Sequence, residues 1–430
     1  MLRRVLLAAV LSGAATSVMP VQAHDVQGTR LLLDVAQSAL ELELQLPLEQ
    51  LSLALPGPVP GMDAAELSPQ AAQLISDYVQ AHLQARTRAG VPLDMTVHGV
   101  SRSRSAETQL VVLHARLEPR VPAAVRVFEL DYDAIVHRVV THNIYVFVRR
   151  DLQSALLGDE PELSGLLHYQ KRSLIIDRSR GNLWRGFKAV FVLGMRHIRE
   201  GSDHLLFLLM LLLPAPLLAI RGRWASPASM RHGTVQTIEI VSAFTLGHSL
   251  TLIGSTLWAA ELPAQPVEIA IAVSILVSGV HAMRPVFAGR EALVAAGFGL
   301  VHGLAFASAL GGFGFDHTQL AISLLGFNLG VEAMQLAVVA LVMPWLWLAS
   351  RSRHYLHVRQ LGAACAVVAA GGWLAERAFG VQTVVPKAVE LAAVHAAWLA
   401  AGLAVTAAAL FLLYAAPRSA EPRNVWPAKR

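Results

Sequence analysis

The stretch Gly194-Met-Arg-His197-Ile-Arg-Glu200-Gly201-Ser-Asp203-His204-Leu-Leu-Phe207 lies where a mixed polar chain gives way to a strongly apolar one. In a single helix, His197 and His204 would share a face with Glu200 between them. The two histidines would then lie about 10 Å apart along the helix axis. That separation is too large for both to bind one metal ion at the usual ligand distance of about 2.0–2.1 Å. Either Gly201 breaks the helix and folds His204 back, or each histidine meets ligands from other helices. Alternatively, the stretch is an interfacial segment whose polar residues face lipid headgroups.

The composition indicates an integral membrane protein with room for one soluble domain. Of the 430 residues, 54% are hydrophobic and 15% charged, whereas soluble chains carry about 25% charged residues. The net charge of +5 comes from short Arg-rich loops rather than a basic patch, so nucleic-acid binding is not expected. The single cysteine, Cys365, excludes a disulfide framework and a cysteine metal site, which leaves 17 histidines, the carboxylates and the backbone as ligands.

The chain begins like a secretory signal peptide over residues 1–23. Arg3 and Arg4 precede an apolar core, and Val21-Gln-Ala23 has the small-x-Ala end of a cleavage site. Cleavage there would make His24 the first residue, whose amine and ring could chelate a transition metal, unless His24 merely follows the cleavage site. We therefore expect residues 24–183 to form an exported, extracytoplasmic domain.

Alternating apolar and polar residues predict that this exported domain is β-rich, a small sandwich with one helix. The alternation is clearest in Leu40-Glu-Leu-Glu-Leu-Gln-Leu-Pro47, and Ser68-Pro69 has the N-cap and first-turn residues of a helix that runs to about Leu83. Other strand-like runs lie at 31–36, 95–100, 108–115, 124–130 and 143–148. Residues 152–183 are expected to form a last strand or a linker.

Several polar residues cluster between two of these strands. They are Asp131, Asp133, His137, His142 and Asn143. The cluster is either a metal or ligand loop or an ordinary solvated loop.

Residues 184–416 are predicted to form a transmembrane domain of about seven helical spans, each near the ~20 residues needed. The spans are placed at 203–220, 234–258, 267–287, 292–311, 318–347, 361–380 and 391–415, and residues 186–198 are expected to lie at the outer interface or to re-enter. Arginines follow the first, third, fifth and last spans. By the positive-inside rule, the chain is a multi-pass protein of a bacterial-type inner membrane, with a periplasmic N-terminal domain and a cytoplasmic tail at 417–430.

Ionisable and polar residues inside the spans indicate functional sites, because each costs a few kcal/mol in a bilayer. His248, His302, Asn328 and Glu332 lie at similar depths in their spans, so we expect them to meet below the stretch that contains His197 and His204. His281 lies nearer the cytoplasmic end of its span, and we expect it to be an exit position. Gly247, Gly303 and Gly330 beside these groups allow close helix approach. The predicted metal ligands are His197, Asp203, His204, His248, His302 and Glu332. The predicted supporting polar groups are Glu200, Ser249, Thr251, Asn328, Gln335 and His281.

Imidazole and carboxylate without thiolate suit nickel, cobalt, zinc or iron. This inventory fits a metal permease, in which Glu332 balances charge. It also fits an intramembrane hydrolase, in which zinc activates water and Glu332 or Asp203 is the general base. A third alternative is a seven-span sensor with a periplasmic ligand-binding domain, which would need a signalling partner because only about 15 residues follow Tyr414. No Gly-rich phosphate loop is present. A transporter is favoured over an enzyme.

At four stretches, 194–207, 244–252, 298–307 and 327–335, the chain resembles the HupE/UreJ family of hydrogenase and urease accessory membrane proteins, in the form with an exported N-terminal domain. His197, Asp203 and His204 match the family's first-span His/Asp-His motif, although Ile198 stands where many members have proline. The resemblance implies a nickel or cobalt permease that supplies metalloenzyme maturation. Its implied partners are the metal ion, the lipid bilayer and maturation factors.

Overall fold

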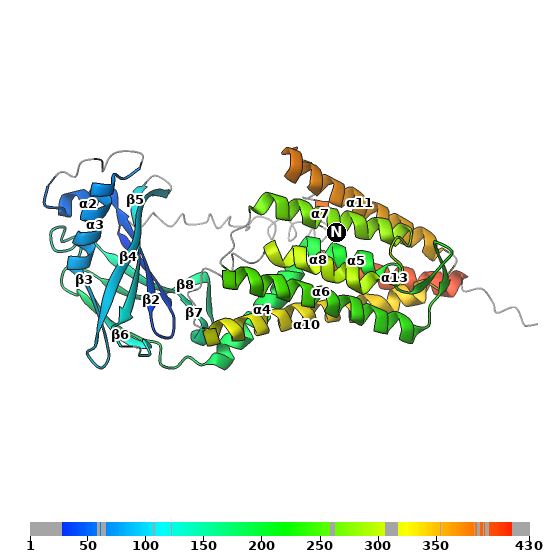
Figure 1. The fold of residues 1–430 in the computed structure, drawn as a ribbon, viewed down its shortest axis with the longest axis horizontal. Helices are drawn as coiled ribbons and strands as arrows, with labels where there is room; N and C mark the ends of the chain where they lie inside the picture. The colour runs from blue at the N-terminus through cyan, green and yellow to red at the C-terminus, as the bar shows by residue number, and fades with distance from the viewer. Residues whose placement is uncertain are drawn as a thin grey trace, which may run out of the picture. The chain divides into compact units, whose positions relative to one another are not determined.

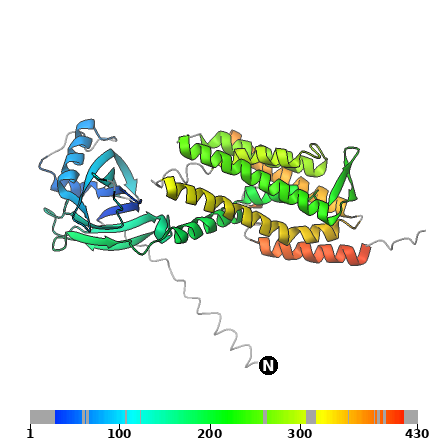
Figure 2. The same ribbon diagram turned by 60° about the horizontal axis from the view of Figure 1, so that its bottom comes forward.

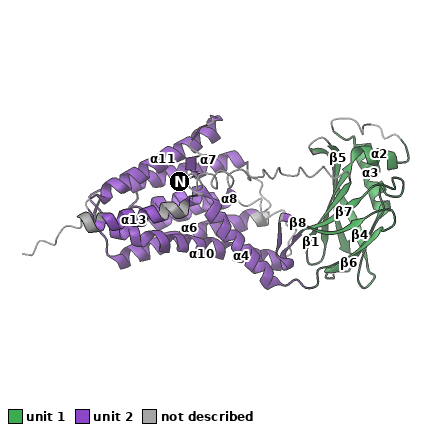
Figure 3. Ribbon diagram, turned by 180° about the vertical axis from the view of Figure 1, so that it is seen from behind, with its two compact units in different colours: residues 1–149, 161–179 green, residues 150–160, 180–430 purple. Residues whose placement is uncertain are grey.

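A computed structural model describes residues 28–57, 61, 66–105, 108–121, 123–258, 263–305, 317–352, 354–381, 383–384, 388–389, 391 and 395–414. The predicted signal peptide and C-terminal tail lie outside these residues. The chain divides into two compact units, one of Met1–Arg149 with Pro161–Ser179 and one of Arg150–Glu160 with Arg180–Arg430 (Figure 3).

A nine-stranded sheet dominates the first unit. Its strands run in the order β8-β7-β1-β2-β5-β4-β3-β6-β9, and the pairs β1–β2, β2–β5, β5–β4, β4–β3, β3–β6 and β6–β9 are antiparallel. Figure 1 shows the sheet as arrows, together with the helices α2 (Leu48–Ala54) and α3 (Pro69–His82). The strands are β1 (Thr29–Val35), β2 (Leu40–Pro47), β3 (Leu83–Thr87), β4 (Pro92–Ser105), β5 (Thr108–Pro119), β6 (Val127–Tyr132), β7 (Ile144–Asp151), β8 (Leu156–Leu167) and β9 (Ser173–Asp177).

Alternation explains this sheet, as the sequence predicts. In β2, Leu40, Leu42, Leu44 and Leu46 are all buried, and full burial of one leucine contributes about 1.5–3 kcal/mol. The helix predicted after Ser68 is α3 (Pro69–His82), and the Ser68 hydroxyl accepts a hydrogen bond from the amide of Ala71 at 3.2 Å. A second, short helix, α2 (Leu48–Ala54), was not predicted.

The predicted two-sheet sandwich is wrong, because all nine strands belong to one sheet. The sheet curves strongly (Figure 2), which lets one apolar face fold around its own core. The long strands β4 and β5 make this possible, since their register shifts between Val97 and Gly99, and such a bulge bends and twists a strand. Alternation reveals that one face is buried but not which strands bury it.

Helices make up most of the second unit. They are α4 (Leu183–Glu200), α5 (Ser202–Leu212), α6 (Met230–Trp258), α7 (Ala264–Met283), α8 (Glu291–Ala305), α10 (His317–Ala349), α11 (Tyr355–Phe379) and α13 (Ala396–Tyr414). Four helices among the described residues, α6, α7, α10 and α11, are long and apolar enough to cross a membrane, and α5 and α8 are shorter apolar helices. These helices fit a membrane protein, while the count of about seven spans stays a prediction.

The first predicted span, 203–220, extends too far. Its helix α5 ends at Leu212, and a hairpin follows, formed by β10 (Leu217–Ile220) and β11 (Arg223–Pro227). Pro214 and Pro216 account for the end of the helix, because proline lacks the amide that an α-helix needs. Arg221 and Gly222 both have positive φ, 49° and 72°, as a two-residue hairpin turn requires.

Three pairs of helices pack side by side in this unit: α6 with α8, α4 with α10, and α7 with α11. The segment predicted at 186–198 as a short interfacial or re-entrant piece belongs to α4, an 18-residue helix. Glycine lets α4 touch α10, since a Cβ on Gly330 would collide with the carbonyl oxygen of Phe191. A Cβ on Gly194 would likewise meet the carbonyl oxygen of Phe327.

Candidate metal centre

Gly201 breaks the opening motif into two helices. It stands between the end of α4 at Glu200 and the start of α5 at Ser202, with φ −73° and ψ 94°. The break turns the chain so that the rings of His197 and His204 lie 4.6 Å apart between centroids. Of the two arrangements open from the sequence, the structure therefore shows the break at Gly201, and it also brings histidines of other helices to this place.

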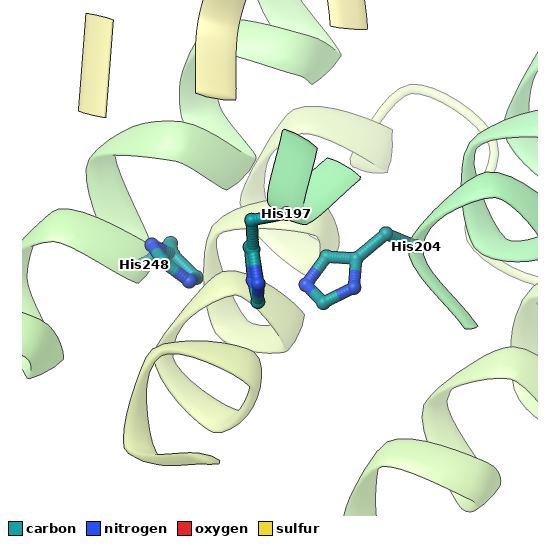
Figure 4. A group of neighbouring side chains, drawn as sticks. All are labelled: His197, His204 and His248. Atoms are coloured by element: carbon teal, nitrogen blue, oxygen red, sulfur yellow. The ribbon is translucent and has the colours of Figure 1, made fainter. Parts of the chain in front are cut away.

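Two further histidines complete the cluster. His248 of α6 lies 6.1 Å from His197 and 6.4 Å from His204, and His302 of α8 lies 5.0 Å from His204, all between ring centroids. In Figure 4 the ring of His197 lies between those of His204 and His248. Four helices, α4, α5, α6 and α8, thus each contribute one imidazole, and α5 adds the carboxylate of Asp203.

The possible ligand atoms form two overlapping groups. In the first group, ring nitrogens of His197, His204 and His248 lie within 4.8 Å of one another. In the second group, a carboxylate oxygen of Asp203 and ring nitrogens of His204 and His302 also lie within 4.8 Å of one another. Ligands at 2.0–2.1 Å from one ion are at most about 4.2 Å apart. Small side-chain rotations would therefore let either group hold an ion. His204 belongs to both groups.

The hydrogen bond of His204 determines which of its nitrogens is available. Its Nδ1 lies 2.9 Å from Oδ1 of Asp203, and an ionised carboxylate only accepts. Nδ1 therefore donates, and the lone pair is on Nε2, which has no hydrogen-bond partner among the described residues. A carboxylate that orients a histidine in this way is the usual support of a metal-binding imidazole.

His302 is oriented by Ser274 of α7. The Ser274 hydroxyl lies 3.0 Å from Nε2 of His302 and donates its only proton to the carbonyl oxygen of Ile271 at 2.7 Å. Ser274 must therefore accept from Nε2–H. This leaves the lone pair on Nδ1, for which the described part of the chain supplies no hydrogen-bond partner.

The cluster lies in apolar surroundings. His248 and His302 are 0% and 1% exposed, and His204 is 6% exposed. Phe244 packs 5.2 Å from His302, and Phe327 packs 5.4 Å from His197. A buried lone pair without a partner costs free energy, which makes Nε2 of His204 and Nδ1 of His302 candidate ligand atoms for a metal ion.

Close approach of α6 and α8 brings His248 and His302 together. A Cβ on Gly303 would meet both the hydroxyl of Thr251 and the carbonyl oxygen of His248. A Cβ on Gly299, one turn earlier, would meet the carbonyl oxygen of Phe244. Gly299 and Gly303 thus form a small-xxx-small seam, with His302 at its end.

Other predicted residues belong to neither group. Glu332 accepts a hydrogen bond from Ser242 at 2.8 Å, and Gln335 accepts one from Thr245 at 2.9 Å, both between α10 and α6. Asn328 lies beside His248, and its amide donates to the carbonyl oxygen of Leu324.

The remaining supporting residues have local partners. Ser249 and Thr251 donate to carbonyl oxygens of their own helix. Glu200 is exposed and pairs with Arg199 at 2.9 Å. His281 stacks on Phe287 with 3.7 Å between ring centroids, away from the histidine cluster.

Sequence reasoning missed Ser274 and Ser242. Ser274 and Ser278 are four residues apart in an otherwise apolar span, so both lie on one face of α7. That spacing was the available signal. It marks a polar face, but it does not show that this face meets His302.

Comparison with known proteins identifies the domain that contains this cluster. Residues 170–377 match the family model described as HupE / UreJ protein, which confirms the resemblance seen in the sequence. The match spans α4 to nearly the end of α11 and therefore includes the four histidines. No curated protein and no solved structure matches the chain.

Proposed function

We propose that the HupE/UreJ domain of this chain is a permease for a divalent transition metal ion, nickel or cobalt, that supplies metalloenzyme maturation. One observation supports the proposal above all others. Four imidazoles from four helices converge around His204 in apolar surroundings, and hydrogen bonds to Asp203 and Ser274 orient two of them with a lone pair available. Nitrogen and oxygen ligands without thiolate suit nickel and cobalt.

The two overlapping groups suit transport better than permanent binding. Conduction requires sites that bind an ion strongly enough to admit it and weakly enough to release it. An ion held by His197, His204 and His248 could move toward His302 while Nε2 of His204 remains bound. The ion would then keep at least one ligand at every position along its path, which lowers the free-energy barrier to its movement.

A line of polar contacts leads away from the cluster along α6. His248, Thr245 and Ser242 follow one another at intervals of three residues, and the last two contact Gln335 and Glu332 of α10. Glu332 offers the next carboxylate toward the N-terminal end of α6, which the loop charges predict to be cytoplasmic. We infer that the ion leaves along this line.

The arrangement favours a permease over the hydrolase. The hydrolase requires a general base within hydrogen-bond reach of a metal-bound water. Of the two bases considered, Glu332 contacts Ser242 and lies outside both ligand groups. Asp203 accepts a hydrogen bond from Nδ1–H of His204, which suits an orienting role.

The test measures bound metal and uptake together. The protein is purified in detergent through a tag without histidine, bound nickel, cobalt and zinc are determined by mass spectrometry, and radiolabelled nickel is followed into cells. We expect His302→Ala and His204→Ala to abolish both binding and uptake. His357→Ala is the control, because His357 is exposed on α11.

Tightly bound zinc without uptake would contradict the permease and support the hydrolase. Uptake that survives both histidine substitutions would show that the cluster is not on the path of the ion.

A further inference from the structure

A second histidine cluster lies in the β-rich unit. His82 at the C-terminal end of α3, together with Asp133 and His137 of the loop after β6, offers ligand atoms within 4.8 Å of one another. Two of these residues belong to the loop that the sequence left open between a ligand site and a solvated turn. His82 lies about 50 residues earlier, and only the fold brings it to this loop.

Hydrogen bonds orient both rings of the cluster. His82 Nδ1 lies 2.7 Å from Oδ1 of Asp133, and His137 Nδ1 lies 3.2 Å from the carbonyl oxygen of Asp133. Both oxygens accept, so each Nδ1 donates and each Nε2 keeps its lone pair. The two rings stack with 4.3 Å between centroids and 13° between planes. Modest rotation about χ2, a soft torsion in histidine, would let the two Nε2 atoms converge on one ion.

The loop is held in a strained conformation that places His137 beside Asp133. The amide of His137 donates to the carbonyl oxygen of Asp133 at 3.1 Å, so these residues stand one helical turn apart. Between them Ile135 has φ 66°, which is costly for a β-branched residue. The Tyr78 hydroxyl accepts from the amide of Ile135 at 2.8 Å and stabilises this conformation.

The cluster is open to solvent, unlike the one between the helices. The side chains of His82 and Asp133 are 25% and 28% exposed. An ion bound there could keep water in its remaining positions and exchange readily. Arg172 opposes binding, because its Nη1 lies 3.1 Å from Oδ2 of Asp133 and places a positive charge beside the site.

We propose that His82 and His137, whose rings Asp133 orients, form a second binding site for a divalent transition metal ion, in the β-rich unit. Two imidazoles, with water in the remaining positions, suit nickel, cobalt and zinc. The site does not depend on the proposed transport, because all its residues belong to the first unit.

The experiment counts ions on the full chain in detergent. Nickel and zinc are titrated separately by calorimetry, and bound ions are counted by mass spectrometry. All proteins have the substitution His24→Gln, which removes a competing chelate at a processed amino terminus. We expect two ions per chain, one lost on His137→Gln or His82→Gln and the other lost on His204→Ala. His98→Gln is the matched control, since His98 is exposed on β4 of the same unit.

The variant Arg172→Ala distinguishes a cluster that binds a metal ion from a cluster that only stabilises the fold. Removal of the charge should lower the Kd of this site by up to about 30-fold. Two unit charges at about 4 Å in water correspond to about fivefold, and a divalent ion doubles that interaction energy. A purely structural cluster would show no such gain. A stoichiometry unchanged in His82→Gln and His137→Gln would overturn the proposal. If the proposed permease site fails instead, one ion remains, and it is lost on His137→Gln but not on His204→Ala.

Discussion

At the scale of single residues, the hydrogen bond from His302 to Ser274 should determine how tightly the ion binds. Ser274→Ala removes the acceptor that holds the ring with Nδ1 available. Loss of such an outer partner typically weakens metal affinity 10–100-fold. We expect a nickel Kd raised by about that factor, measured by calorimetry. Ser278→Ala is the control, because the Ser278 hydroxyl donates to the carbonyl oxygen of Ser274 and does not touch the ring. Equal affinity in both variants would contradict the assigned tautomer.

His142 should make the β-rich unit sensitive to acid. It is 1% exposed, and burial lowers its pKa to about 4. Its Nε2 accepts from the amide of Thr29, while Nδ1 contacts Gln50. The unfolded chain binds a proton near pH 6.5 and the folded one only near pH 4. Stability is therefore lost as pH falls through this window, by about 2–3 kcal/mol.

Hydrogen exchange of β1 peptides at pH 7 and pH 5 would measure this loss. His142→Gln cannot titrate, so its stability should change much less between the two values. An equal pH dependence in both proteins would show that other groups are responsible.

At the scale of elements, the seam between α6 and α8 should tolerate no added methyl group at Gly303. A Cβ there would push α8 away from His248, whereas a Cβ on Gly297 of the same helix meets nothing within 4 Å. Overpacking typically costs about 1–3 kcal/mol. We expect Gly303→Ala to lower the unfolding temperature and to abolish nickel binding. Gly297→Ala should leave both unchanged, and similar behaviour of the two variants would contradict the packing argument.

The interface of α6 with α10 should affect release more than binding. Glu332 contacts Ser242 and belongs to neither ligand group. Glu332→Gln keeps the shape and removes the negative charge. We expect nickel to stay bound in detergent while uptake into cells falls by about tenfold or more, in line with the cost of losing a charge partner. Binding lost together with uptake would place Glu332 among the ligands instead.

At the scale of the whole molecule, the predicted orientation can be tested with cysteine labels. In a Cys365→Ala background, Ala225→Cys lies in the β10–β11 hairpin, and His98→Cys lies in the β-rich unit. We expect a membrane-impermeant maleimide to label His98→Cys in intact spheroplasts. It should label Ala225→Cys only after permeabilisation, because the arginines near the hairpin favour the cytoplasm. The reverse pattern would refute the orientation.

Local sequence patterns were sufficient to predict many of the helices and strands of this protein. Alternation of leucine and polar residues determined β2, and Ser68-Pro69 determined the start of α3. The apolar runs of α6, α7, α10 and α11 were visible because burial of a whole helix needs apolar residues all round. The motif around His197 also indicated the family and the candidate ligands.

Only the tertiary structure decided which of those ligands meet. The break at Gly201 folds His204 back onto His197, and the glycine seam places His302 beside it, while Glu332 lies with Ser242. Likewise, only the fold joins His82 to Asp133. The physical reason is that periodicity reports which face of an element is buried. The partner across that face depends on backbone breaks and close helix contacts between residues far apart in the chain.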